Sequence, residues 1–170
     1  MELDATTFDT IATHLLPRGA RLTPDEATAI AQLAELATDV DFDEMSSELA
    51  LRRQIQGHVC RLAGISPDRV PPPTPLPLDD EERRAWIARL APQITTPGAG
   101  ALAYVLVYLC TVGDLALEPV ETSFVDELEE ALGLDHERAS DLVARVTEMI
   151  TPDVGEELAA PPGDEPTLHQ

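Results

Sequence analysis

Acidic side chains recur in two similar segments of the chain, and their oxygen atoms are the groups whose type and spacing point most directly to chemistry. The segments TDVDFDEMSSE (38–48) and TVGDLALEPVE (111–121) share a Thr, an Asp and a Glu at matching places. The three matching pairs are each 73 residues apart and are Thr38/Thr111, Asp41/Asp114 and Glu48/Glu121. Self-similarity at one fixed spacing predicts an internal duplication.

Carboxylates in this arrangement favour a hard cation. Asp39, Asp41 and Asp43 alternate like positions one, three and five of an EF-hand, but Glu44 and Ala50 stand where that motif needs Gly and Glu. The segment is therefore no EF-hand, although hard cations accept several carboxylates in flexible geometry. The two segments predict a site for Ca²⁺ or another divalent cation, with the candidate ligands Asp39, Asp41, Asp43, Glu48, Asp114, Glu118 and Glu121.

An alternative interpretation of the same acids needs no ion. Asp43, or Glu118 before Pro119, is placed to serve the N-terminus of a following helix through capping and the helix dipole. Glu48 and Glu121 would then remain in solvent. Both interpretations stay open at the level of the sequence.

The elements that must position these acids are helices. Thr23, Pro24 and Glu26 form an N-terminal capping box, and apolar residues recur with helical spacing in the stretch that follows. A nearly all-apolar stretch after Thr96 predicts a central helix. Helices are expected over 7–16, 24–38, 43–62, 79–90, 96–109, 119–132 and 136–150. The predicted fold is all-α, a compact bundle of six or seven helices made of two related helical-hairpin halves.

A proline-rich stretch divides the chain. PPPTPLP (71–77) cannot be helical and is expected to run as an extended connector, with an SH3-type ligand as the alternative. We therefore predict one domain over 1–150, with halves of about 7–66 and 79–150 joined by a linker over 67–78. Residues 151–170 are rich in Pro, Gly and acids, and are expected to form a flexible acidic tail.

The second half carries a family resemblance. LAYVLVYLCTVGDLALEPVETSFVDELEEALGLDHERASDLVARV places an Asp after an apolar helix, a Glu seven positions later, and a second helix that closes on LGL. This arrangement resembles the repeat of the TerB-like (tellurite resistance protein TerB) family, and the resemblance extends over roughly 24–150. It implies a compact all-helical protein of the stress response, with Asp41 and Glu48, and Asp114 and Glu121, as acidic pairs that bind a divalent cation. The chain departs from the family pattern at Phe42, which occupies the glycine place, and at Gly113, which precedes Asp114.

Charge restricts the classes of partner. The 170-residue chain has 32 acidic and 11 basic residues and a net charge of −21, and every basic residue is Arg. This negative field repels nucleic acid and anionic membranes and favours a metal ion or a protein with a basic surface. The acidic first residues lack the pattern of a signal peptide, and the longest apolar stretch, 99–112, is too short to span a bilayer. We therefore expect a cytoplasmic protein without membrane insertion.

Catalytic signatures are missing from the sequence. HExxH, GxSxG, P-loop and GxGxxG motifs do not occur, and Cys60 and Cys110 are expected to be small buried hydrophobic residues. The expectation is a non-enzymatic accessory protein of a stress response or a multiprotein assembly. Two alternatives stay open: a pure interaction module that docks a basic partner without metal, and an acidic mimic of nucleic acid. The sequence does not predict the oligomeric state.

Overall fold

The computed structural model describes residues 4–38, 46–71, 79–111 and 119–150, apart from the side chains of 46–48 and 119–121. Within these ranges the chain forms helices and no strand, which confirms the predicted all-α class. The helices are α1 (Ala5–Leu15), α2 (Pro24–Thr38), α3 (Ser46–Ala63), α4 (Asp80–Leu90), α5 (Ala99–Thr111), α6 (Pro119–Ala131) and α7 (His136–Ile150). Two short 3₁₀ turns, η1 (Pro67–Arg69) and η2 (Ala91–Gln93), lie beside α3 and α4.

Side-chain caps fix where several helices begin. An acceptor oxygen that precedes a helix satisfies an amide of its first turn, which has no partner inside the helix. The capping box expected at α2 is present, because Thr23 Oγ1 accepts from the Glu26 amide at 3.2 Å and Glu26 Oε2 accepts from the Thr23 amide at 2.7 Å. A second capping box, between Asp79 and Glu82, opens α4. The cap of α7 is Asp135, whose carboxylate accepts from the Arg138 amide at 2.8 Å.

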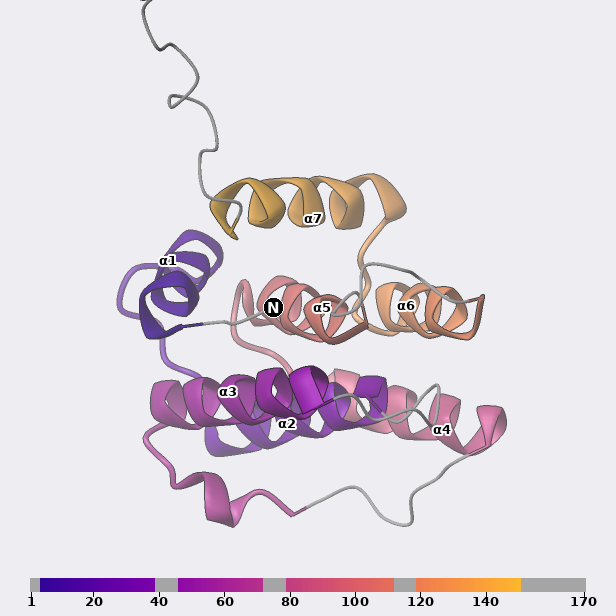
Figure 1. Cartoon of the computed structure of the whole chain (residues 1–170), viewed down its shortest axis with the longest axis horizontal. Coiled ribbons are helices and arrows are strands. Elements are labelled where there is room, and N and C mark those ends of the chain that lie inside the picture. Colours follow the sequence, from indigo (N-terminus) through magenta and orange to yellow (C-terminus); the bar gives the residue numbers. More distant parts are fainter. Residues whose placement is uncertain (1–3, 39–45, 72–78, 112–118, 151–170) are drawn as a thin grey trace, which may run out of the picture.

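The bundle is built around α5. Figure 1 shows α2, α3 and α4 on one side of α5, and α1 and α7 on the other. Helices α1, α2, α3, α6 and α7 all pack against α5. Nearly every residue of α5 is buried, so the expectation of a central, all-apolar helix is confirmed. Burial of apolar surface on all sides of one helix supplies the main stabilisation of such a fold.

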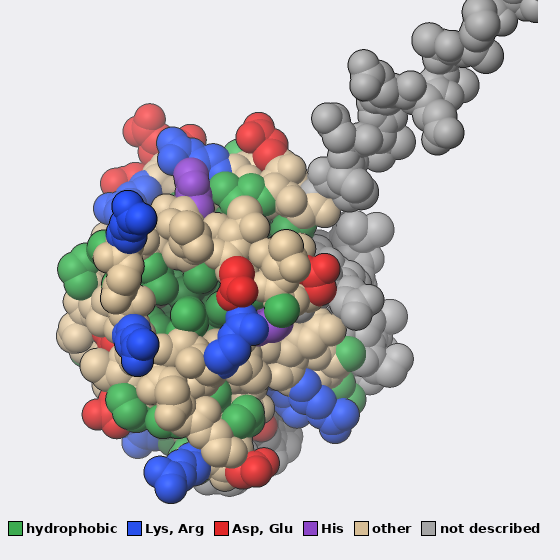
Figure 2. Space-filling model, turned by 90° about the vertical axis from the view of Figure 1, so that its left-hand side faces the viewer, with side chains coloured by type: hydrophobic (Ala, Val, Ile, Leu, Met, Phe, Trp, Pro, Cys, Tyr) green, Lys and Arg blue, Asp and Glu red, His purple; other side chains and the backbone are tan. Residues whose placement is uncertain are grey.

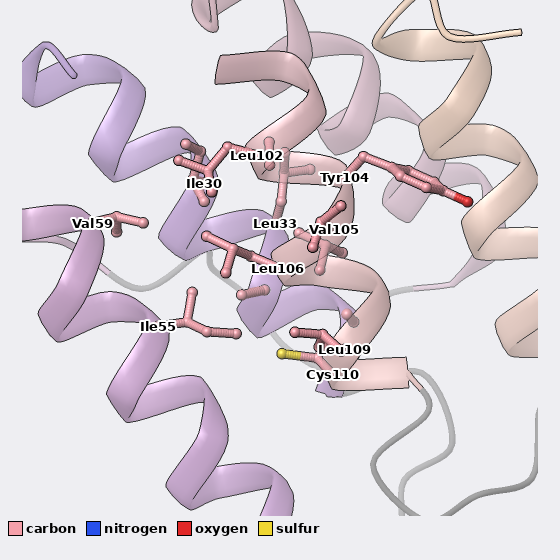
Figure 3. Packing of buried hydrophobic residues seen from close by; sticks show 14 of the residues in the cluster. Ile30, Leu33, Ile55, Val59, Leu102, Tyr104, Val105, Leu106, Leu109 and Cys110 are labelled. Carbon is pink, nitrogen blue, oxygen red and sulfur yellow. The ribbon is translucent and has the colours of Figure 1, made fainter. Parts of the chain in front are cut away.

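Branched and aromatic side chains from several helices meet at α5. Figure 3 shows Ile30 and Leu33 of α2 and Ile55 and Val59 of α3 facing the apolar side chains of α5. All four are fully buried. Cys60 and Cys110 are both buried, as expected from the sequence. Burial raises the pKa of the Cys60 thiol, which keeps it in the unreactive protonated form.

Helices α2 and α5 run side by side in the same direction. Their first turns meet, because Glu26 of α2 accepts hydrogen bonds from Thr95 and Thr96, which immediately precede α5. Their last residues, Thr38 and Thr111, therefore lie toward the same end of the bundle (Figure 1). The two predicted acidic segments both begin at that end.

The two hairpins α2–α3 and α5–α6 also end their helices in the same way. Thr38 and Thr111 are buried, and each hydroxyl donates to the carbonyl three residues before it, at 3.0 and 2.8 Å. Gly64 after α3 and Gly133 after α6 each donate to the carbonyl three residues earlier, and the next residue donates to the carbonyl five residues earlier. This paired bonding is the Schellman motif. The shared ends agree with a duplication, which stays a prediction.

Several predicted boundaries shift, and the starts of α1 and α5 have a clear cause. Helix α1 covers Ala5–Leu15 instead of 7–16, because Asp4 caps it through the Thr7 amide. Helix α5 begins at Ala99 instead of Thr96, because Gly98 has a φ of +83° and breaks the helical backbone there. The predicted start of α3 at Asp43, the connector over 72–78 and the tail over 151–170 lie outside the described residues.

Candidate functional site

Only some of the acidic residues predicted as metal ligands lie within the described part of the chain. Asp39, Asp41, Asp43, Asp114 and Glu118 lie outside the described residues. Glu48 and Glu121 belong to α3 and α6, and each is the third residue of its helix. The backbone therefore gives this pair matching positions, while their side chains are not described. Within the described ranges, no three His, Cys, Asp or Glu side chains are grouped to hold a metal ion.

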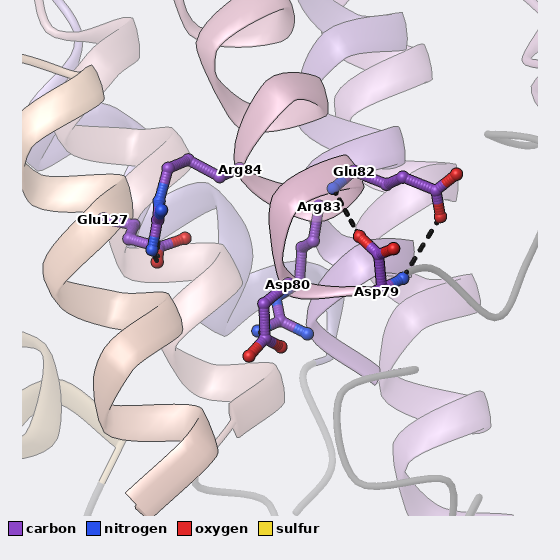
Figure 4. A network of polar contacts seen from close by, with 6 residues as sticks. All are labelled: Asp79, Asp80, Glu82, Arg83, Arg84 and Glu127. Carbon is purple, nitrogen blue, oxygen red and sulfur yellow. Dashed lines mark hydrogen bonds and ion pairs between the residues drawn. The ribbon is translucent and has the colours of Figure 1, made fainter.

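A polar site that the sequence did not reveal lies where α4 packs against α6. Helix α4 opens with its capping box. The Glu82 amide donates to Asp79 Oδ1 at 2.8 Å, and the Glu82 carboxylate accepts from the Asp79 amide. Asp80, Glu81 and Glu82 follow in the first turn of the helix, where negative charge interacts favourably with the helix dipole. Figure 4 shows this acidic turn and the Arg side chains that follow it.

Arg84 joins the two helices. Its Nη2 and Nε atoms donate to Glu127 Oε1 of α6 at 2.7 and 3.2 Å. This bond and the charge of Glu127 raise the pKa of Arg84 above its usual value. The Arg84 side chain is 66% exposed and that of Glu127 only 15%. The pair therefore has a buried anionic end and a cationic end in solvent.

The second oxygen of Glu127 has no hydrogen-bond partner among the described residues. Oε2 is shielded from solvent and accepts no hydrogen bond from any described residue. A carboxylate oxygen that is buried without a donor costs free energy, about 1–3 kcal/mol for a typical polar group. The Nε atom of Arg83, a buried residue of α4 that binds Asp80 through Nη2 at 2.8 Å, is likewise without a partner among the described residues. Glu127 and Arg83 thus each have one buried atom without a partner among the described residues.

A groove opens beside the Arg84–Glu127 pair. Its volume is about 350 Å³. It is lined by Arg84, Ile87, Ala88, Glu127, Glu130 and Ala131. We call it the α4–α6 groove. Apolar atoms form its floor, and two carboxylates and one guanidinium supply its charge. Such a surface suits a group with an apolar stem and a positively charged end, as in an Arg or Lys side chain.

Other buried polar groups hold the fold together. Glu26 is fully buried and also accepts hydrogen bonds from the residues before α5. Burial by itself would raise its pKa, but the amides of Thr23, Thr96 and Thr95 lower the pKa of Glu26 to about 2. The sequence signals its bond to Thr23 through the capping box, and contains no signal for the bonds formed 69 and 70 residues later.

A second polar network joins α5, α6 and α7. Tyr104 Oη donates to Glu129 Oε1 at 2.8 Å, and the other oxygen of Glu129 lies 3.3 Å from His136 Nδ1. Burial and the bond to Glu129 raise the pKa of Tyr104 above its usual value. The phenol therefore stays protonated and acts as a structural donor.

His58, which the sequence left without a role, stacks on Phe8 with ring centroids 4.5 Å apart.

Comparison of the chain with protein-family models, with curated proteins and with solved structures gave no match. The resemblance to the TerB-like family therefore stays an interpretation of the sequence pattern. None of the helices that the described residues form is long and apolar enough to cross a membrane.

Proposed function

We propose that the chain is a non-enzymatic, acidic cytoplasmic accessory protein of the TerB-like type, and that it docks a basic segment of a partner protein in the α4–α6 groove. The observation that carries this proposal is the α4–α6 groove itself, where the carboxylates of Glu127 and the exposed Glu130 border apolar side chains. A partner's guanidinium or ammonium group would pair with these carboxylates, and its apolar stem would cover Ala88 and Ala131.

The charge of the chain supports the same partner chemistry. A net charge of −21 attracts a basic surface over a long range and repels polyanions. The exposed acids Asp80, Glu81 and Glu130 lie on the two helices that form the groove. Their negative charge would also attract a basic partner at the groove itself. The expected complex forms faster and more tightly at low ionic strength.

The chemistry of the groove supports binding over catalysis. Glu127 is engaged by Arg84 through one oxygen, and the remaining lining groups are apolar or are a second carboxylate. Among the described residues that line the groove there is no Ser, Cys, His or Tyr to act as a nucleophile or to relay a proton. The groups present hold a cation and contact its stem.

A binding measurement tests the proposal. The probe is a fluorescently labelled amphipathic peptide of Arg, Leu and Ala, followed by anisotropy at about 50 and about 300 mM NaCl. The Glu127→Gln, Glu130→Gln variant is compared with Glu137→Gln, Glu148→Gln, which removes the same charge from exposed positions of α7. We expect the groove variant to bind about tenfold more weakly or worse, and the α7 variant to bind like the parent chain.

Equal weakening in both variants would show that net charge alone attracts the peptide, and would overturn the assignment to the groove. Because Glu127→Gln alters a bond between helices, Glu130→Gln alone is measured as well. Glu130 is exposed, so its substitution leaves the packing of α6 unchanged. Unchanged affinity in both the double and the single groove variant would reject the proposed site.

Divalent cation binding by the acidic segments is a second candidate function, and one observation favours it. Thr38 and Thr111, from which the two segments begin, end parallel and adjacent helices with the same hydroxyl bond. Both segments therefore start from the same end of the bundle, where carboxylates from both would be available to one ion. Glu48 and Glu121 also occupy matching positions, each as the third residue of its helix.

A further inference from the structure

A small basic pocket lies on the opposite side of the bundle from α4 and α6. Its walls are the last turn of α1, the start of α5 and one face of α7, and its volume is about 300 Å³. The lining residues are His14, Leu15, Gly98, Ala101, Arg138, Asp141, Leu142 and Arg145. Figure 2 views the molecule from the side of α1, where Arg side chains (blue) are spread among exposed hydrophobic ones (green).

The side chains that line this pocket have a charge opposite to that of the chain. The chain carries a net charge of −21, whereas the pocket has two Arg and one His side chain against the single carboxylate of Asp141. Neither the Arg138 nor the Arg145 guanidinium forms an ion pair or hydrogen bond with a described residue, unlike Arg61, Arg83 and Arg84. Two guanidinium groups that lack a partner among the described residues and line one cavity point to an anionic ligand.

The start of α5 adds donors to the same wall. Gly98 and Ala101 line the pocket. The Gly98 carbonyl accepts from Leu102 and the Thr96 carbonyl from Ala99, which leaves the amides of Gly100 and Ala101 without a backbone acceptor in the described structure. The N-terminus of a helix of this length carries partial positive charge.

Close packing fixes the α5 start against α1. A Cβ atom on Gly98 would lie 2.1 Å from the Leu15 carbonyl oxygen, so only Gly permits this approach. This contact places His14 and Leu15 of α1 in the same pocket lining as the start of α5. The pocket thereby combines donors from three helices that are distant in sequence.

We propose that this pocket binds the phosphate group of a small phosphate monoester. Arg138 and Arg145 form ion pairs with the phosphate, the α5 amides donate to it, and Leu15 and Leu142 contact its organic part. Asp141 accepts from a ligand hydroxyl and separates the two guanidinium groups along α7. The volume of about 300 Å³ and the negative charge of the whole chain select a small anion over a nucleic acid or an anionic membrane.

Amide chemical shifts of the full chain test the proposal, with inorganic phosphate and phenyl phosphate as probes and NaCl at matched ionic strength as the blank. We expect saturable shifts at Gly98, Gly100 and Ala101, with phenyl phosphate binding more tightly because its ring contacts the leucines. The Arg138→Gln, Arg145→Gln variant should lose about tenfold or more in affinity. The matched control, Arg53→Gln, Arg69→Gln, removes the same charge at two exposed positions outside the pocket and should bind like the parent.

Three results would overturn the inference. Shifts that increase linearly without saturation would reveal a general salt effect. Saturable shifts that survive in the Arg138, Arg145 variant would place the anion elsewhere. If phenyl phosphate binds no more tightly than inorganic phosphate, the pocket does not contact the organic part of a ligand, and the proposal of a phosphate monoester is wrong. His14→Gln is measured too, because it removes a pocket side chain from exposed α1 surface without a change in α7.

Discussion

The carboxylate of Glu26 accepts hydrogen bonds from the amide and the hydroxyl of Thr95, a residue 69 positions later in the chain. Thr96 adds two more bonds, through its amide and its hydroxyl. One fully buried side chain in the first turn of α2 thereby fixes the residues that lead into α5. Because α2 and α5 pack against each other in the bundle, the bonds of Glu26 fix the starts of these two helices relative to one another.

Glu26→Gln should destabilise the fold by about 3 kcal/mol, judged from the lowered pKa and the bonds to a charged acceptor. Both oxygens of Glu26 accept from a backbone amide, so the NH₂ group of Gln faces an N–H donor in either orientation. Urea unfolding measures the change. Glu148→Gln, on the exposed surface of α7, is the control and should alter stability by less than about 0.5 kcal/mol. Equal stability of the two variants would contradict the role of Glu26.

The same carboxylate predicts a pH dependence. The pKa of Glu26 is about 2 in the folded chain and 4.5 as the reference value for the unfolded one, so its ionised form stabilises the fold. This contribution is fully present above the unfolded pKa and is lost as the pH falls through the folded pKa. The difference in unfolding free energy between the parent and Glu26→Gln should therefore be constant near pH 7 and should shrink between about pH 5 and pH 2. A difference that does not change over this range would argue against the assigned pKa.

Local patterns in the sequence predict the helices but not the contacts between them. Thr23 and Glu26 predict the start of α2, because a capping box involves residues only three positions apart. The other bonds of Glu26 depend on how α2 packs beside α5, and no local pattern contains that information. Gly98 is similar, since the lack of space for a Cβ atom there arises from its contact with Leu15 of α1.

The α4–α6 groove could not be predicted for a different reason. Helix α6 contains Asp126, Glu127, Glu129 and Glu130, and the sequence does not distinguish the one that is bound by Arg84 from the one that meets Tyr104. Because the chain has 32 acidic residues, its composition does not indicate which of them form specific contacts in the fold. The predicted metal ligands stand out by their repeated spacing, and they stay a prediction because their side chains lie outside the described structure.

Gly98→Ala should destabilise the protein by more than about 2 kcal/mol. The new Cβ would lie 2.1 Å from the Leu15 carbonyl oxygen, and the φ of +83° disfavours any residue with a side chain. Gly57→Ala is the matched control, because Gly57 lies within α3 and a Cβ there meets no atom within 4 Å. That change should be neutral or stabilise the fold by up to about 1 kcal/mol. Thermal unfolding of both variants separates the two cases, and a neutral Gly98→Ala would disprove the close packing of α1 on α5.

Cation binding predicts a stability change that depends on the identity of the ion. Thermal unfolding is followed with a chelator, with Mg²⁺ and with Ca²⁺ at matched ionic strength, because salt alone screens the repulsion within a chain of net charge −21. A cation at a hundred times its dissociation constant should stabilise the fold by about 2.7 kcal/mol, which raises the unfolding temperature by several degrees. Asp41→Ala, Glu48→Ala should abolish that rise, whereas Asp25→Ala, Glu148→Ala, with the same charge change at exposed positions, should retain it. Identical curves with chelator and with both ions would reject the cation site, and the acids of the two segments would then be explained by helix capping and exposure to solvent.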